Sequence, residues 1–289
     1  MKVITPIALG LGLFLALGAR AQTADVPEAE RAAIIQTARD YGDGFYAGDA
    51  VRMERAIHPD FNKVVTMVFP PTKGIYVGYS SFTDLVELAR AGVAISDPVR
   101  TIDPRVLWID GDIACAKLTS PMFNDYLQMV KIDGDWKIIN VLWTQGPEVP
   151  SRQPLTGFDP EKENAAAAKT AEDFVVGALS GDAVRVEAAL HPEVSRAVFQ
   201  KDPQSGRVRI SRNGFSALVE PVRAKLQTAP ENQRKTEIKV LDIMDGMAFI
   251  VASAPQGSSY IQMSWLNGQW KIFNILVKAA PRPVPAPKK

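Results

Sequence analysis

Apolar residues recur at helical spacing where the folded part of the chain begins. Four of them lie three or four positions apart: Ile34, Ala38, Tyr41 and Phe45. This pattern predicts a helix over residues 28–47. Gly48 is suited to end that helix, and Asp49 is suited to cap a second one that runs to about Ile57. Pro59 cannot continue a helix, so the second helix is expected to end at the His-Pro pair.

A third helix is predicted over residues 81–90. Ser81 and Asp84 have the spacing of a capping box. Its apolar face is formed by Phe82, Leu85, Val86 and Ala89. A later segment has the same pattern, with Phe215, Leu218, Val219 and Val222. Both segments therefore predict amphipathic helices.

From Val106 onward the pattern changes to short β-branched and aromatic runs. Asp133-Gly134 and Asn267-Gly268 predict two-residue hairpin turns, because both central positions tolerate positive φ. In the strand after the first turn, simple alternation places Trp136, Ile138, Asn140 and Leu142 on one face, and Lys137, Ile139, Val141 and Trp143 on the other. Three helices followed by a curved antiparallel sheet predict an α+β domain.

The chain repeats itself once. Residues 38–60 and 171–193 agree at 12 of 23 positions, and residues 126–129 and 136–140 recur at almost the same offset. The repeated unit has about 120 residues, an ordinary domain size. We therefore expect one domain over residues 25–146 and a second over residues 163–279. A Pro- and Gly-containing linker over residues 147–162 and a Pro-rich tail over residues 280–289 complete the chain.

The amino terminus has the features of a secretory signal peptide. A basic start at Lys2 precedes an apolar run that is too short to span a membrane comfortably, and Ala19-Arg20-Ala21 suits signal peptidase. We expect residues 1–21 to be removed and the mature protein to be periplasmic or secreted. A retained membrane anchor is the alternative.

Composition excludes several classes of protein. The 289 residues include 46% hydrophobic and 22% charged residues, with a net charge of +1, which is typical of a folded protein. Removal of Lys2 and Arg20 with the signal peptide changes the net charge to −1, so the basic footprint of a nucleic-acid binder is absent. The single cysteine, Cys115, cannot form an internal disulfide and is expected to be a small buried residue. Two histidines and one cysteine do not make a metal-ligand cluster, and no cofactor motif occurs.

The order of these features resembles the nuclear transport factor 2-like fold. The chain is most similar to the lumazine-binding branch of this fold, which is related to the SnoaL-like proteins. The similarity rests on the order of a helix, Gly-Asp, His-Pro, a third helix and then the segment DYLQMVKIDGDWKIIN at residues 125–140. The resemblance covers residues 28–145 and 163–278. It implies two tandem cone-shaped domains, each with a pocket between its helices and the concave face of its sheet. Some relatives are isomerases, dehydratases or cyclases, and others only bind or assemble.

Ketosteroid isomerase is the relative with the clearest catalytic requirement, a carboxylate base and acidic donors. Tyr41 matches the donor tyrosine of that family, but the second copy has Phe174. The position of the base is occupied by Val65 and Val198, which accept no proton. The isomerase mechanism therefore does not transfer, although Asp60 or Glu193 could approach a pocket mouth.

Polar residues repeated in both copies are the candidate ligand contacts. They are Tyr41, His58, Tyr126, Gln128 and Asn140 in the first copy and His191, Tyr260, Gln262 and Asn274 in the second. Each histidine either transfers protons or binds backbone at the helix end, and each asparagine is either a pocket donor or a structural tie. Arg31, Arg39, Arg52 and Arg55 are interpreted as solvated helix faces, and the loop-like basic run from Lys201 to Arg212 is interpreted as surface.

Two functions are consistent with this pattern. The first is a small-molecule-binding or scaffold protein that takes a small apolar or aromatic ligand, as an intramolecular pseudo-dimer or a homodimer, without nucleic acid, membrane, metal or cofactor. The second is an isomerase- or lyase-like enzyme whose weak catalytic candidates are Tyr41, His58 and Asp60. We favour binding, because the second copy lacks the Tyr41 hydroxyl.

Overall fold

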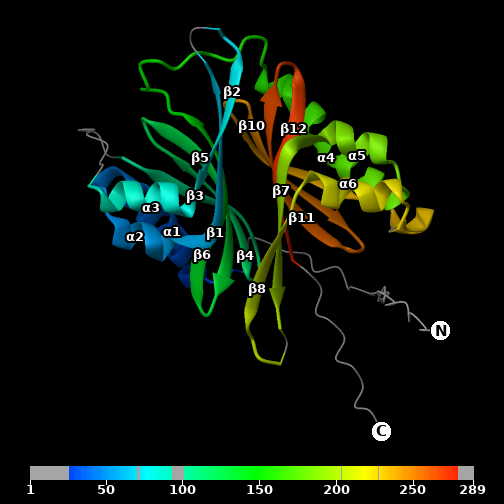
Figure 1. The fold of residues 1–289 in the computed structure, drawn as a ribbon, viewed down its shortest axis with the longest axis horizontal. Helices are drawn as coiled ribbons and strands as arrows, with labels where there is room; N and C mark the ends of the chain where they lie inside the picture. Colours follow the sequence, from blue (N-terminus) through cyan, green and yellow to red (C-terminus); the bar gives the residue numbers. More distant parts are fainter. Residues whose placement is uncertain (1–25, 70–71, 93–100, 203, 227, 279–289) are drawn as a thin grey trace, which may run out of the picture.

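The computed structural model describes residues 26–69, 72–92, 101–202, 204–226 and 228–278. The predicted signal peptide, residues 1–21, and the Pro-rich tail, residues 280–289, lie outside the described residues. Within these ranges the chain forms two α+β units, each with three α-helices and a six-stranded sheet (Figure 1). The predicted fold class is confirmed.

The two units have the same order of elements. The first contains α1 (Glu28–Ala47), α2 (Ala50–Ala56), β1 (Ile57–Val68), β2 (Ile75–Ser81), α3 (Phe82–Arg90), β3 (Asp103–Asp110), β4 (Ile113–Thr119), β5 (Phe123–Ile132) and β6 (Asp135–Gln145). The second contains α4 (Pro160–Ser180), α5 (Ala183–Ala189), β7 (Leu190–Lys201), β8 (Val208–Asn213), α6 (Phe215–Arg223), a 3-10 turn (Glu231–Gln233), β9 (Glu237–Met244), β10 (Met247–Ala254), β11 (Gly257–Leu266) and β12 (Gln269–Lys278).

The local signals at the element ends act as expected. Gly48 ends α1 in the left-handed region, at φ 65°. The Asp49 side chain accepts a hydrogen bond from the backbone N–H of Arg52 (3.1 Å) and so caps α2. Ser81 and Asp84 form the predicted capping box of α3. Short-range sequence signals therefore mark the end of α1 and the starts of α2 and α3.

Each sheet contains two strands that the sequence pattern did not predict, β1 and β2 in the first and β7 and β8 in the second. In the first unit β1 and β2 lie between α2 and α3, and the sheet order is β2-β1-β6-β5-β4-β3. The β1–β6 pair is parallel, whereas the other pairs of this sheet are antiparallel. The His58-Pro59 pair consequently lies inside β1, one residue past the end of α2.

A β-bulge changes which face each residue of β6 occupies. The register with β5 shifts between Gln128 and Met129, so Ile139 is the extra residue. The predicted alternation is therefore wrong after Ile138. Trp136, Ile138, Val141 and Trp143 pack with the helices, whereas Ile139 and Leu142 lie in the layer between the two sheets.

The two sheets pack against each other through the faces that their helices leave uncovered. One continuous apolar cluster contains residues of both units, including Val64, Tyr126, Phe249 and Tyr260. The helices lie on the two outer sides, α1 to α3 on one and α4 to α6 on the other (Figure 1). Cys115 is fully buried in this layer, as expected, and burial raises the pKa of its thiol.

Candidate functional site

Most of the predicted ligand contacts form a hydrogen-bonded layer between the two sheets. Gln128 Nε2 donates to the backbone oxygen of Tyr260 (2.8 Å), and Gln262 Nε2 donates to the backbone oxygen of Tyr126 (2.8 Å). Both amide side chains are fully buried. Each domain thus supplies the same bond to the other, as in a two-fold symmetric dimer interface.

The tyrosines and asparagines extend this layer. Tyr126 donates its hydroxyl to Asp242 (2.9 Å), and Tyr260 donates to Asp110 (2.5 Å). Burial, together with these nearby negative charges, raises the pKa of both tyrosines. The asparagines donate to glutamines of their own domains, Asn140 to Gln128 (2.7 Å) and Asn274 to Gln262 (2.9 Å). These six side chains lie on the side of each sheet opposite the expected pocket, and a ligand-binding role for them stays a prediction.

Arg212 belongs to the same layer, so its interpretation as surface is wrong. Its guanidinium donates to the side chains of Asn140 (2.8 Å) and Ser195 (2.9 Å) and to the backbone oxygen of Asp60 (2.9 Å). Burial lowers the pKa of Arg212 to about 10. Strand β8 of the second domain places Arg212 against the first domain. The loop-like sequence around Arg212 predicted neither this strand nor its contacts with the first domain.

The two histidines contact the backbone of their own strands. His58 Nδ1 accepts from the backbone N–H of Asp60 (3.0 Å), and His191 Nδ1 accepts from that of Glu193 (3.2 Å). Burial lowers the pKa of both imidazoles. The Asp60 carboxylate is more than half exposed and lies 3.8 Å from His58 Nδ1. Since Nδ1 already has a partner, only Nε2 of each ring is available for other chemistry.

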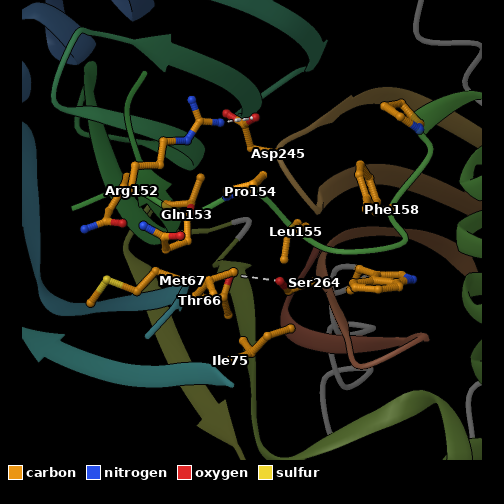
Figure 2. A pocket seen from close by; sticks show the side chains of 15 residues that line it. Thr66, Met67, Ile75, Arg152, Gln153, Pro154, Leu155, Phe158, Asp245 and Ser264 are labelled. Atoms are coloured by element: carbon orange, nitrogen blue, oxygen red, sulfur yellow. Dashed lines mark hydrogen bonds and ion pairs between the residues drawn. The ribbon is translucent and has the colours of Figure 1, made fainter. Parts of the chain in front are cut away.

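A cavity lies at the junction of the two domains, beneath the linker. It has a volume of about 180 Å³ and is bounded by β1, β6, β11 and the linker (Figure 2). Its polar lining includes a pair of hydroxyl groups, Thr66 and Ser264, and the ion pair between Arg152 and Asp245. This cavity contains none of the predicted site residues.

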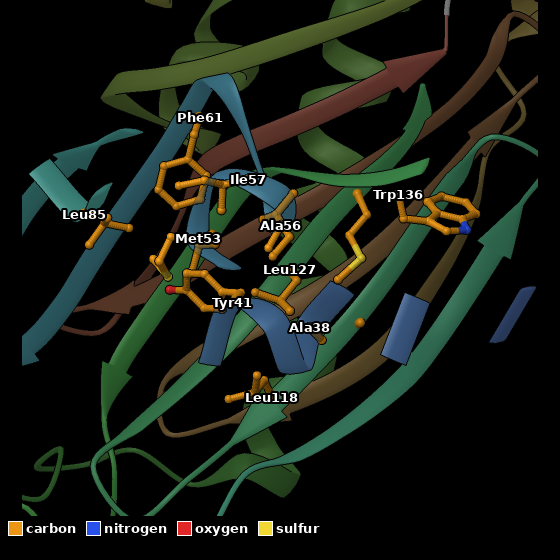
Figure 3. Packing of buried hydrophobic residues seen from close by; sticks show 14 of the residues in the cluster. Ala38, Tyr41, Met53, Ala56, Ile57, Phe61, Leu85, Leu118, Leu127 and Trp136 are labelled. Atoms are coloured by element: carbon orange, nitrogen blue, oxygen red, sulfur yellow. The ribbon is translucent and has the colours of Figure 1, made fainter. Parts of the chain in front are cut away.

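The interior of the first domain contains a buried charged cluster. Tyr41 points from α1 into the core between helices and sheet (Figure 3). Its hydroxyl oxygen accepts a hydrogen bond from Lys63 Nζ (2.5 Å), and Lys63 Nζ lies 3.8 Å from Asp125 Oδ1. Tyr41, Lys63 and Asp125 are 1%, 6% and 0% exposed. One helix and two strands, β1 and β5, therefore bring an acid, a base and a hydroxyl together away from bulk solvent.

Aromatic rings surround the Lys63 ammonium. Its Nζ lies 4.8 Å from the ring centre of Trp143, 5.2 Å from that of Tyr41, 5.6 Å from that of Phe45 and 5.9 Å from that of Phe123. All four distances are within the range of cation–π attraction. The rings exclude water and offer flat apolar surfaces on several sides of one positive charge.

Burial controls the protonation of this cluster. It raises the pKa of Asp125 to about 6, with the Lys63 charge opposing the shift. It also lowers the pKa of Lys63 and raises that of Tyr41. Neither carboxylate oxygen of Asp125 has a partner within hydrogen-bond distance among the described residues, and only the longer contacts with the Lys63 ammonium (3.8 Å) and the Tyr41 hydroxyl offset its burial. A buried carboxylate in this state has unused acceptor capacity, which a polar ligand can fill.

The second domain lacks this cluster. At the positions that correspond to Tyr41, Lys63 and Asp125 it has Phe174, Arg196 and Ser259. Trp143 and Phe123 correspond to Val277 and Gly257. Charge, carboxylate and aromatic enclosure are thus present together only in the first of the two interiors.

Of the three residues in this cluster, Tyr41 was predicted as a site residue from the sequence, whereas Lys63 and Asp125 were not. Both lie in strands, and β1 was not predicted. Within β1 the alternation of Phe61, Lys63 and Val65 is the signal that was available, because it places a lysine among core-facing residues. In β5 the corresponding signal is an aspartate between Phe123 and Leu127 on the same face.

Among the described residues no group of three or more His, Cys, Asp and Glu side chains has the arrangement of a metal site. Within the same residues no helix is both long and apolar enough to cross a membrane.

The chain belongs to the family described as "Putative lumazine-binding", whose model matches it twice, over residues 29–144 and 162–276. Each match coincides with one structural unit. The predicted tandem pair of nuclear transport factor 2-like domains is confirmed. A comparison with curated proteins gave no match.

Solved structures similar to part of the chain include several proteins described as NTF2-like. An NTF2-like protein of unknown function from Silicibacter pomeroyi is 18% identical with a TM-score of 0.33, over 41% of this chain and 98% of its own. One from Shewanella baltica is 17% identical with a TM-score of 0.33, over 43% of this chain and 99% of its own. An NTF2-like protein from Cytophaga hutchinsonii is 14% identical with a TM-score of 0.31, over 42% and 99%.

Proposed function

We propose that this protein binds a small planar organic molecule in the interior of its first domain, beside Tyr41, Lys63 and Asp125. The observation that supports this most directly is the buried Asp125 carboxylate, which has no hydrogen-bond partner among the described residues. A ligand that donates hydrogen bonds to Asp125 and stacks on the surrounding rings would satisfy that carboxylate. Lumazine, the heteroaromatic molecule in the description of the family, has this combination of a flat ring system and N–H donors.

The second domain has a different role in this proposal. Its interior lacks the charged cluster, but its sheet covers the face of the first domain's sheet that the helices of that domain leave uncovered, through the layer that contains Gln128 and Gln262. It therefore serves as a built-in partner subunit that keeps the first domain closed. We propose no nucleic-acid or membrane partner for the mature chain.

Lumazine itself is the probe for the test. Its fluorescence would be titrated with the full mature chain and with the variants K63M and D125N, with R196M as the matched change in the second domain. We expect saturable quenching that weakens at least tenfold in K63M and D125N, because each loses a charge-assisted contact. R196M should bind like the wild type. Equal affinity in all four proteins would refute the assignment of the site.

We also propose that the protein acts in the periplasm or outside the cell. The support is the arrangement of basic, apolar and small residues up to Ala21. Expression in a bacterial host, followed by mass measurement of the purified chain, tests this. A mature protein that begins at Gln22 supports export, whereas an intact Met1 in the cytoplasmic fraction contradicts it.

An isomerase-like activity is the second candidate, and the pKa of Asp125 favours it. A carboxylate that titrates at about 6 can take a proton from carbon near neutral pH, and Tyr41 can donate a hydrogen bond to the oxyanion that forms. Exchange of the α-protons of cyclohexanone with deuterated water, followed by NMR, measures this chemistry. Exchange that the wild type accelerates and D125N does not would establish the enzyme, and no acceleration leaves binding alone.

A further inference from the structure

The junction cavity differs from the equivalent place at the other end of the interface between the sheets. Its floor is formed by Thr66 of β1 and Ser264 of β11, one residue from each domain. The duplication places Phe199 and Val130 at the corresponding positions. Both of these are fully buried in the apolar layer between the sheets. One end is thus filled with apolar side chains, whereas the other holds two hydroxyls beside an open volume.

The hydrogen bonds of the two hydroxyls determine what they offer to the cavity. Ser264 Oγ donates its single hydrogen to the backbone oxygen of Gly246 (3.2 Å). In that arrangement the 2.8 Å contact between Thr66 Oγ1 and Ser264 Oγ uses the hydrogen of Thr66. The pair then has no donor left for the cavity, and Thr66 Oγ1 is an acceptor with spare lone pairs. A group that binds there must supply an N–H or O–H.

The remaining walls combine apolar side chains and an ion pair with the neutral polar groups of Gln145, Gln153 and the buried indole N–H of Trp265, which has no hydrogen-bond partner among the described residues. Ile75, Leu155 and Phe158 line the cavity (Figure 2). Trp265 lines it as well, and Phe158 meets Trp265 edge to face at 5.7 Å between ring centres. Arg152 is paired with Asp245 (2.6 Å), and the other carboxylate oxygen of Asp245 accepts from Asn124 (2.8 Å). The cavity therefore has no unpaired charge at this ion pair, which favours a neutral occupant.

The size of the cavity limits the occupant further. A volume of about 180 Å³ is smaller than a typical drug-sized ligand site, but it holds a single substituted aromatic ring. A second hollow of about 280 Å³ shares Ile75, Leu155 and Trp265 with the first and extends it under the linker.

From these features we infer a second ligand site, at the junction of the two domains and independent of Lys63 and Asp125. It takes a small neutral aromatic molecule with one hydrogen-bond donor, of the phenol or aniline type. The ring lies against Phe158, Trp265 and Leu155, and the donor reaches Thr66 Oγ1. Since the linker forms one wall, the occupant contacts both domains and the segment that connects them.

Phenol and anisole form a matched pair of probes, because anisole carries the same ring and oxygen without a donor. Binding to the full mature chain would be titrated by NMR, with the indole N–H signal of Trp265 as the reporter of position. We expect phenol to bind about fivefold more tightly than anisole, the effect of one net hydrogen bond. The T66V variant should bind phenol only as tightly as the wild type binds anisole. Its affinity for anisole should equal that of the wild type.

A second variant tests the site without changing Thr66, in case the T66V substitution disturbs the structure of the protein. I75W adds bulk at a partly exposed edge strand that lines the cavity, whereas Y76W makes the same kind of change at the neighbouring exposed position, which does not line it. I75W should abolish phenol binding and Y76W should retain it. Phenol binding that survives both T66V and I75W, or no shift of the Trp265 signal at saturation, would overturn the inference. Lumazine binding in the first domain should be unchanged in I75W, so the two proposed sites fail separately.

Discussion

The interiors of the two domains have diverged, whereas the tyrosine, glutamine and asparagine positions that join their sheets have stayed alike. Both copies place tyrosine, glutamine and asparagine in the layer between the sheets, and the glutamine bonds have the same length in both directions. Inside the domains, the positions of Tyr41, Lys63 and Asp125 are occupied by Phe174, Arg196 and Ser259 in the second copy. The shared interface constrains both copies because each side chain there must fit the other domain. An interior has no such partner and is free to specialise.

The largest test of this comparison is to break the buried pair in the first domain. Removal of either partner leaves the other charge buried without compensation, so K63M or D125A should each destabilise the protein by about 3–5 kcal/mol. The double variant K63M/D125L should recover most of that loss. Midpoints of urea unfolding measure all three.

The matched change in the second domain sets the scale. Arg196 is partly buried, and its Nε has no hydrogen-bond partner among the described residues. R196M therefore removes a guanidinium nitrogen that is poorly satisfied and should cost less than about 1 kcal/mol or stabilise the domain. An equal loss in R196M and K63M would show that the two interiors are energetically equivalent, against the comparison.

The free energy of unfolding should change with pH differently in wild type and in D125N. The expected difference is similar in size to the loss predicted for K63M and D125A. The pKa of Asp125 is about 6 in the folded protein against 3.8 as its ordinary value. Between these values the folded state binds more protons than the unfolded state, so this residue's contribution to stability falls as pH rises from 4 to 6 and stays lost at pH 7. The shift corresponds to about 3 kcal/mol.

The measurement is the free energy of unfolding of wild type and D125N between pH 4 and pH 7. His58 and His191 have lowered pKa values and contribute in the opposite direction, but both proteins contain them, so their contributions cancel in the difference. A difference that is flat across this range would contradict the burial-driven shift at Asp125.

At the interface the comparison predicts equality. Q128L leaves the backbone oxygen of Tyr260 without its donor, and Q262L does the same for Tyr126. A buried acceptor that loses its partner costs about 1–3 kcal/mol, so the two variants should lose similar stability. Thermal unfolding of both proteins checks this. A loss of stability in only one of them would mean that the two glutamine hydrogen bonds contribute unequally to stability despite their equal lengths.

The features predicted well from the sequence are those that depend on neighbours in the chain. Gly48, Asp49 and the Ser81–Asp84 box act on their own helix ends, and Asp133-Gly134 closes its own hairpin with both φ angles positive. The duplication made the domain count visible as well. Such signals need no knowledge of what packs against them.

What the sequence did not reveal depends on contacts between distant segments. The bulge at Ile139 moves Asn140 from the expected face to the interface, and only the pairing with β5 shows the extra residue. Strand β1 has a proline and a lysine among its apolar residues, which obscured it and concealed Lys63. Polar residues repeated in both copies suggested a pocket, but a buried layer between two sheets requires the same residue types.

The smallest expected effects are at the N-terminal caps of α2 and α5, where both copies have an aspartate. Asp49 accepts from the N–H of Arg52 and Asp182 from that of Arg185, each at 3.1 Å. D49A and D182A should each cost about 1 kcal/mol, because one helix-terminal N–H loses its acceptor. D49N and D182N keep an acceptor and should cost much less.

Two exposed valines provide the controls for these caps. Val51 and Val184 follow the capped ends, with 69% and 77% exposure, so V51A and V184A should lie within about 0.5 kcal/mol of wild type. Equal losses in D49A and D182A, measured by urea unfolding, would place the caps with the interface among the features that both copies share. A cap that matters only in the first domain would instead extend the divergence of the interiors to the helices that cover them.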